Sequence, residues 1–202
     1  MPASRRLLNQ LEACLSRGRG GRLGWIRVRL GGGGSRGDGG GQGLTPSLGG
    51  VAGTVIRSAR REDVPAIVAL LADDAIGAGR ETTAELEPYL RAWEAVAANP
   101  SARLVVAEDG DGGIAGTLQL DLLDSLTRGG MRRAQVEGVR VARGARGTGV
   151  GRTLLEWAIA EARREGCGLI QLTSDARRDD AARFYEALGF TASHRGFKRA
   201  LT

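Results

Sequence analysis

The feature that most constrains the fold is a glycine-rich stretch from Val136 to Arg152, read V-E-G-V-R-V-A-R-G-A-R-G-T-G-V-G-R. Its first half belongs to a valine-rich segment, Ala134 to Val141, where apolar and polar residues alternate as in a half-buried strand. Its second half places four glycines within eight residues, and an apolar run with helical spacing follows from Val150. This order predicts a strand, a tight turn and the start of a helix.

Such a turn favours the binding of an anion. Glycines let backbone N–H groups point inward and let a ligand come close. The first N–H groups of the helix and the positive end of its dipole favour a phosphate. Arg146 and Arg152 flank the turn and are candidates for charge-assisted contacts. No G-K-[ST] closes the stretch and its glycine spacing is not the dinucleotide fingerprint, so it predicts neither a Walker A loop nor a Rossmann site. A tight connection without a ligand is the alternative.

Two motifs carry a resemblance to a known family. The spacing [Q/R]-x-x-G-x-[G/A], filled by Arg146, Gly149 and Gly151 after a V-x-V strand, resembles the acetyl-coenzyme A signature of the GNAT superfamily of N-acetyltransferases. The run from Ala181 to Phe190, A-A-R-F-Y-E-A-L-G-F, looks like that family's C-terminal signature, A-x-x-[FL]-Y-E-x-x-G-F. The motifs occur in the family's order, and the resemblance covers roughly Thr54 to the C-terminus.

The pattern from Thr54 onward predicts one α+β domain, residues 54–202. Strands are expected near 54–57, 103–108, 113–122, 134–141 and 169–173, with a final strand pair across 190–201. Helices are expected from about 61 to 76, 83 to 98, 150 to 165 and 179 to 188. The crossover from 134–141 to 169–173 demands parallel pairing, whereas the earlier strands follow as antiparallel neighbours. The expected fold is a three-layer, mixed and mostly antiparallel sheet with helices on both faces, which the acyl-CoA N-acyltransferase fold of the family also implies.

The resemblance implies a cofactor site along the strand and the turn. The backbone of Val139 and Val141 would hold the pantetheine arm as an added strand does. This contact requires the strand to part from its parallel neighbour, and Gly138 would support a bulge there. The implied cofactor-binding residues are Val139, Arg140, Val141, Arg146, Gly147, Thr148, Gly149, Val150, Gly151, Arg152 and Thr153.

Two side chains are candidates for proton transfer. Amide formation from a thioester needs a neutral amine, a stabilised oxyanion and a proton for the departing thiolate. The resemblance suggests Glu137 as general base, directly or through water; the alternative is a surface carboxylate at a strand edge. Tyr185 matches the family tyrosine that acts as general acid at the coenzyme sulfur; the alternative is a core residue with its hydroxyl at the edge. Arg178 departs from the family, which often has an asparagine at this place, and Arg177 and Arg178 either contact phosphate or begin a solvated helix.

The acceptor amine cannot be read from the sequence. Asp73, Asp74, Arg80 and Glu81 lie between the first two expected helices, where they either contact a cationic amine or remain solvated surface charges. The single histidine, His194, has no partner pattern, so neither a histidine triad nor a metal site is predicted.

The N-terminal segment has a different composition. Residues 1–53 hold 16 of the 33 glycines and eight arginines against Glu12 and Asp38, so the formal charge of +6 lies in this segment. We expect a disordered extension or an over-long start; a targeting peptide and a weak arginine-glycine contact with nucleic acid are the alternatives. No run approaches the ~18 apolar residues of a membrane span. Cys14 and Cys167 make no disulfide framework or metal spacing, and a reducing, cytoplasmic compartment fits best.

These observations predict an enzyme that transfers the acetyl group of acetyl-CoA to a primary amine of a small molecule or peptide. No metal, membrane or specific nucleic-acid partner is expected, and a homodimer through the C-terminal strands would suit the family. One alternative is a non-catalytic module of the same fold that binds acyl-CoA as a sensor or interaction platform. Another makes the N-terminal segment the functional part, as a nucleic-acid or targeting arm.

Overall fold

The computed structural model describes residues 53–73, 81–175 and 177–201. In these residues five strands form one sheet in the order β1-β2-β3-β4-β5. Neighbouring strands are antiparallel except β4 and β5, which are parallel, so the expected mixed, mostly antiparallel sheet is confirmed. The strands are β1 (Val55–Ser58), β2 (Ala102–Glu108), β3 (Ile114–Leu123), β4 (Arg133–Val141) and β5 (Leu169–Leu172). Residues 1–52, which include nearly all of the expected N-terminal extension, lie outside the described part.

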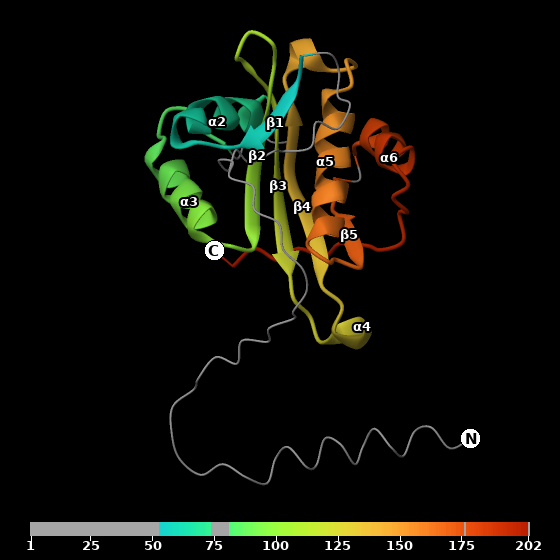
Figure 1. Cartoon of the computed structure of the whole chain (residues 1–202). Coiled ribbons are helices and arrows are strands. Elements are labelled where there is room, and N and C mark those ends of the chain that lie inside the picture. The colour runs from blue at the N-terminus through green and yellow to red at the C-terminus, as the bar shows by residue number, and fades with distance from the viewer. Residues whose placement is uncertain (1–52, 74–80, 176, 202) are drawn as a thin grey trace, which may run out of the picture. The chain divides into compact units, whose positions relative to one another are not determined.

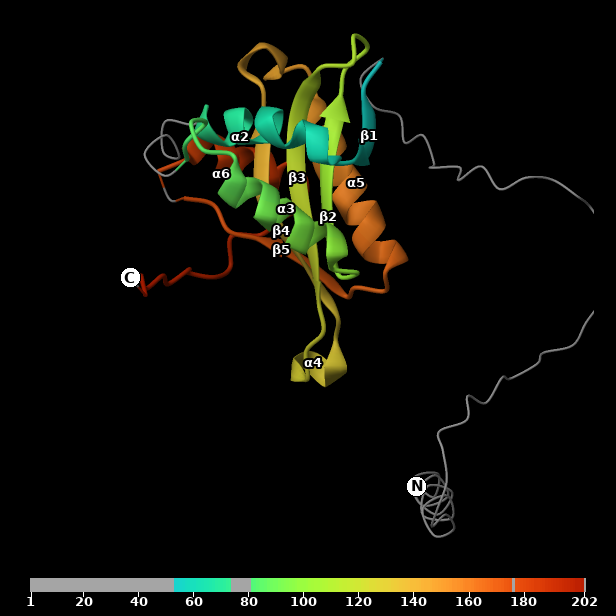
Figure 2. The same ribbon diagram turned by 90° about the vertical axis from the view of Figure 1, so that its left-hand side faces the viewer.

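Helices cover both faces of the sheet. The helices are α2 (Val64–Ala72), α3 (Glu87–Ala98), α4 (Thr127–Gly130), α5 (Val150–Arg164) and α6 (Asp179–Glu186), with the 3-10 turns η1 (Arg61–Asp63) and η2 (Arg143–Ala145). The short helix α4 lies beyond the end of the sheet (Figure 1) and covers neither face. Helix α5 buries Leu154, Leu155 and Ala158 against apolar side chains of β2, β3 and β4. Figures 1 and 2 together show α2 and α3 on one side of the sheet and α5 on the other. The sheet is therefore the middle layer of three.

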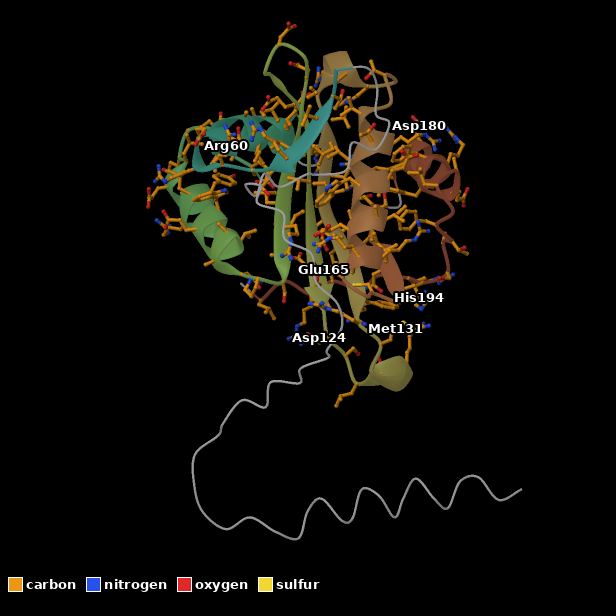
Figure 3. All side chains as sticks on the ribbon, in the orientation of Figure 1. Arg60, Asp124, Met131, Glu165, Asp180 and His194 are labelled. Carbon is orange, nitrogen blue, oxygen red and sulfur yellow. The ribbon has the colours of Figure 1, made fainter. Side chains whose placement is uncertain are left out.

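Ion pairs fix the C-terminal end of α5 to the base of the sheet. Arg103 of β2 pairs with Glu161 at 3.5 Å and with Glu165 at 3.4 Å. Arg132, next to β4, pairs with Glu165 at 3.5 Å and with Asp124 at 3.3 Å. Figure 3 shows Asp124 and Glu165 toward this end of the sheet, away from the glycine turn. The anchored helix thus presents its N-terminal end at the opposite end of the domain.

Two expected elements differ from the structure. The expected strand pair at 190–201 does not form; these residues are irregular, and Phe197 and Leu201 are almost fully exposed. The segment has a single β-branched residue and four basic or histidine side chains, a composition with weak strand propensity. Helix α3 begins at Glu87 and not near residue 83, since Pro88 is favoured only in a first helical turn.

A buried carboxylate holds the corner between β1 and α2. The guanidinium of Arg57 donates to Oδ2 and Oδ1 of Asp63 at 2.6 and 3.0 Å, and the backbone N–H of Arg60 donates to Oδ2 at 2.7 Å. Arg57 also pairs with Glu108 of β2. The hydrogen bonds from Arg57 hold the pKa of Asp63 below its usual range, although burial acts in the opposite direction.

We expect Asp63→Asn to lower the free energy of unfolding by about 2 kcal/mol at neutral pH. Because the folded-state pKa of Asp63 is depressed, its ionised form stabilises the fold above about pH 4, and this stability is lost as pH falls through the folded pKa. Urea unfolding of the full-length wild type and the Asp63→Asn variant should show a smaller difference in the free energy of unfolding near pH 3 than at pH 7. Glu62→Gln is the control, because Glu62 is exposed and its pair with Arg60 is 3.8 Å long. An equal difference at both pH values would contradict the assignment.

Candidate active site

The parallel pairing of β4 and β5 ends partway along β4, before the glycine turn. Their pairing runs from Arg133↔Leu169 to Val136↔Leu172, where β5 ends. Strand β4 continues to Val141 and stays paired with β3 on its other edge. From Glu137 onward, the β4 edge that faced β5 therefore has no partner strand in the described chain. An extended ligand can bind to such an edge through main-chain hydrogen bonds.

A bulge lies at the start of this open edge. Thr117 pairs with Arg140 and Gln119 pairs with Glu137, so β4 has one residue more than β3 between these two pairs. Gly138 lies in the bulge with φ +61°, a left-handed conformation that glycine adopts without strain. The bulge expected at Gly138 is present. It places Glu137, an exposed residue, next to the point where the strands separate.

The glycine turn leads directly into α5. Gly147 and Gly149 have φ of +78° and +99°, and the first helical hydrogen bond runs from the Thr153 N–H to the Gly149 oxygen at 3.0 Å. The N–H groups of Val150, Gly151 and Arg152 precede this bond, so the helix gives them no acceptor. No side chain caps this end, and its first turn contains no acidic residue. A Cβ on Gly147 would meet nothing within 4 Å, so the turn is open to a ligand.

The arginines of the turn are in surface ion pairs. Arg143 pairs with Asp73 at 2.7 Å, and Arg146 pairs with Asp73 at 3.6 Å. Arg146 also donates to the backbone oxygens of Val141 at 3.2 Å and Asp73 at 3.3 Å. Arg152 pairs with Glu156 at 3.6 Å along α5. Such exposed pairs contribute ~1 kcal/mol or less, so an arriving phosphate can compete for these guanidinium groups.

Helix α6 packs beside the turn and carries Tyr185. A Cβ on Gly151 would lie 3.5 Å from Phe184 of α6 and 3.5 Å from Val141 of β4, so these three elements meet there. The Tyr185 ring contacts Phe184 and Phe190, with centroids 5.4 and 6.0 Å apart. Burial raises the pKa of the Tyr185 hydroxyl, and the charges of Arg140 and Arg178 partly offset this effect. The hydroxyl is therefore protonated at neutral pH and available as a proton donor.

The remaining polar candidates have different surroundings. Asp73 belongs to the ion pairs of the turn, and Glu81 accepts a hydrogen bond from the Tyr89 hydroxyl at 3.0 Å. Asp74 and Arg80 lie outside the described residues. His194 is exposed, is 2.8 Å from the Ser193 hydroxyl, and lies toward the end of the domain away from the turn (Figure 3).

Sequence reasoning missed two glutamines beside Glu137. Gln135 of β4 donates to Glu137 Oε1 at 3.0 Å, and Gln171 of β5 donates to Gln135 Oε1 at 2.7 Å. The only signal in the sequence was that Gln135 and Glu137 lie two apart in one strand and so share a face.

Neither a membrane span nor a metal cluster occurs in the described ranges. No helix there is long and apolar enough to cross a bilayer. The same residues contain no group of three or more His, Cys, Asp or Glu side chains that could hold a metal ion.

The fold and the parted strands define the class of this protein. The chain is a three-layer domain in which the parallel pairing ends partway along β4 and an uncapped helix start follows the glycine turn, and this matches the acyltransferase architecture expected from the sequence. The chain belongs to the acetyltransferase (GNAT) family, whose model matches residues 64–190.

The chain is also similar to individual proteins and solved structures. A curated relative, the aminoalkylphosphonate N-acetyltransferase of Salmonella typhimurium, is 45% identical over 56 residues. This match spans 28% of the present chain and only 36% of that relative. The crystal structure of a transcriptional regulator from Bacillus halodurans is 44% identical with a TM-score of 0.70, over 73% of this chain and 99% of its own. A putative acetyltransferase from Agrobacterium tumefaciens is 25% identical with a TM-score of 0.65, over 72% and 99% of the two chains.

Proposed function

We propose that residues 54–202 form an acetyl-CoA-dependent N-acetyltransferase acting on a primary amine of a small molecule or peptide. The observation that carries the proposal is the open edge of β4 from Glu137 to Val141, which leads through the glycine turn to the uncapped start of α5. An extended arm and a phosphate group of one ligand would bind these two features. The local likeness to an aminoalkylphosphonate N-acetyltransferase supports a small acceptor that carries an amine.

Acetyl-CoA would bind along the edge and the turn. The backbone groups of Val139 and Val141 would bind the pantetheine arm, and the N–H groups of residues 149–152 would bind the pyrophosphate. Arg146 and Arg152 would add charge after leaving their surface partners. The cosubstrate supplies an acetyl group activated as a thioester.

Two side chains would move the protons. Glu137 takes a proton from the attacking amine, directly or through water, and the nitrogen forms a bond to the acetyl carbon. The bond from that carbon to sulfur breaks, and the Tyr185 hydroxyl gives its proton to the departing sulfur. The proton held by Glu137 and the one lost by Tyr185 exchange with water, so the net reaction produces an amide and a free thiol.

Binding and turnover of the full-length chain test the proposal. Acetyl-CoA at ~100 times its dissociation constant should stabilise the fold by about 2.7 kcal/mol, seen as a rise of several degrees in melting temperature. An amine panel that includes aminoalkylphosphonates, polyamines and amino acids should then yield acetylated product. A chain that melts cooperatively with no shift on adding acetyl-CoA would overturn the proposal.

One comparison favours a second function. The Bacillus halodurans protein that is 44% identical over nearly its whole length is described as a transcriptional regulator. A non-catalytic module that binds acyl-CoA as a sensor would have the same fold. Tight binding of acetyl-CoA with no transfer to any amine of the panel would identify this second function.

We expect Tyr185→Phe to lower kcat about tenfold while the affinity for acetyl-CoA stays within about twofold of wild type. The phenyl ring keeps the contacts with Phe184 and Phe190, so only the proton donor is lost, and a thiolate is a moderate leaving group that needs limited help. Steady-state kinetics with one amine measures the change. Tyr89→Phe is the control, because its hydroxyl donates to the Glu81 carboxylate and takes no part in the proposed proton transfer, so it should leave kcat unchanged. A Tyr185→Phe enzyme with unchanged kcat would remove the proposed general acid.

A further inference from the structure

A chain of two side-chain amides ends on Glu137. Gln171 Nε2 donates to Gln135 Oε1 at 2.7 Å, and Gln135 Nε2 donates to Glu137 Oε1 at 3.0 Å. Gln135 and Gln171 are paired across β4 and β5, one row before the pairing ends at Val136↔Leu172. Both glutamines are half-buried, whereas Glu137 is exposed. The two hydrogen bonds therefore run from β5 to β4 next to the last residue pair of these strands, and they end at the carboxylate of Glu137, where the open edge of β4 begins.

The chemistry of the groups fixes the direction of the chain. An ionised carboxylate only accepts hydrogen bonds, so Gln135 must turn its nitrogen toward Glu137 and its oxygen toward β5. Gln171 stabilises this orientation because it donates to that oxygen. Glu137 Oε2 has no hydrogen bond or ion pair with the described residues. One carboxylate oxygen is thus held, and the other is left for a substrate.

A second glutamine, Gln119, lies on the same face of the sheet beside Glu137 and can be compared with Gln135. Gln119 of β3 pairs directly opposite Glu137 in the register. Its Nε2 donates to both carboxylate oxygens of Asp121, at 3.0 Å each, and not to Glu137. Two glutamines therefore flank the same glutamate, and only Gln135 bonds to it.

We propose that Gln135 and Gln171 are positioning residues that hold the Glu137 carboxylate for proton transfer, Gln135 by direct contact and Gln171 through Gln135. The proposal rests on the proposed role of Glu137 as general base. An exposed glutamate samples many rotamers, and holding one oxygen raises the fraction of time in which the other faces the amine. The effect falls on the chemical step and leaves cosubstrate binding unchanged.

Kinetics of single and combined variants of the full-length chain test this. Gln135→Leu should lower kcat about tenfold with an unchanged KM for acetyl-CoA, and Gln171→Leu should lower it about threefold, since the bond from Gln135 to Glu137 remains. Gln119→Leu is the matched control and should change kcat by less than about twofold. In a Glu137→Gln background, adding Gln135→Leu should cause no further loss, because the held carboxylate is already absent.

The outcomes separate this proposal from the one on which it rests. An equal fall of kcat on adding Gln135→Leu to wild type and to Glu137→Gln would show a structural role and overturn the positioning proposal. A loss in Glu137→Gln with none in Gln135→Leu would overturn it as well, while leaving Glu137 as the base. Wild-type kcat in Glu137→Gln would overturn the base assignment itself. Melting temperatures of all variants identify any that lose kcat by unfolding.

Discussion

The Glu137→Gln variant should bind acetyl-CoA like the wild type and lose about 100-fold or more in kcat. Glutamine has the shape of glutamate but cannot take a proton from the amine, and positioned bases contribute about 10²- to 10⁴-fold to such reactions. Glu137 is exposed and lies at the bulge where β4 separates from β5, so the substitution removes no packing. Stopped-time assays of acetylated amine at saturating cosubstrate measure kcat, and the melting-temperature shift with acetyl-CoA measures binding.

The control for Glu137→Gln is Asp121→Asn. Asp121 carries a carboxylate on the same face of the sheet, two residues along β3 from Gln119, the residue opposite Glu137. Its oxygens accept from Gln119 and lie off the open edge, so we expect kcat within about threefold of wild type. A similar large loss in both variants would indicate a general effect of negative charge on this face and contradict a base at Glu137.

The sequence predicted the parts of the site that depend on local conformation. Gly138, Gly147 and Gly149 are at positions where a bulge or a turn needs positive φ, and glycine is the residue that tolerates it. The start of α5 at Val150 followed from the end of the glycines and the onset of helical spacing. The parallel pairing of β4 with β5 followed from the crossover helix between them.

The parts that sequence reasoning missed depend on register and on distant partners. The hydrogen bond from Gln171 to Gln135 joins residues that are 36 apart in the sequence. It forms because the register of β4 and β5 places Gln135 directly opposite Gln171. Nothing in the sequence shows which of the many arginines pair with Asp73, which the fold brings to Arg143 and Arg146. The strand pair expected at 190–201 was predicted from the length of this segment and from the glycine near its middle. The segment lacks the alternation of apolar and polar residues that a strand needs.

The Gly149→Glu variant should lose acetyl-CoA binding, with a dissociation constant raised about 100-fold or more. Gly149 is the N-cap of α5, so the new carboxylate would lie beside the free N–H groups that we assign to the pyrophosphate. It would occupy the anion site from within the chain and repel a phosphate. At a cosubstrate concentration that stabilises the wild type by about 2.7 kcal/mol, the variant should gain only about 0.4 kcal/mol.

Two controls separate this effect from strain at Gly149. Gly149 has φ +99°, so any side chain there is strained, and Gly149→Ala shows the strain without the charge. Gly166→Glu adds the same charge at a glycine with φ +74° and open surroundings, at the other end of α5. Both controls should keep most of the melting-temperature shift with acetyl-CoA. If Gly149→Ala loses the shift as fully as Gly149→Glu, the backbone conformation of the turn decides binding. If Gly149→Glu keeps the shift, the start of α5 is not where the phosphates bind.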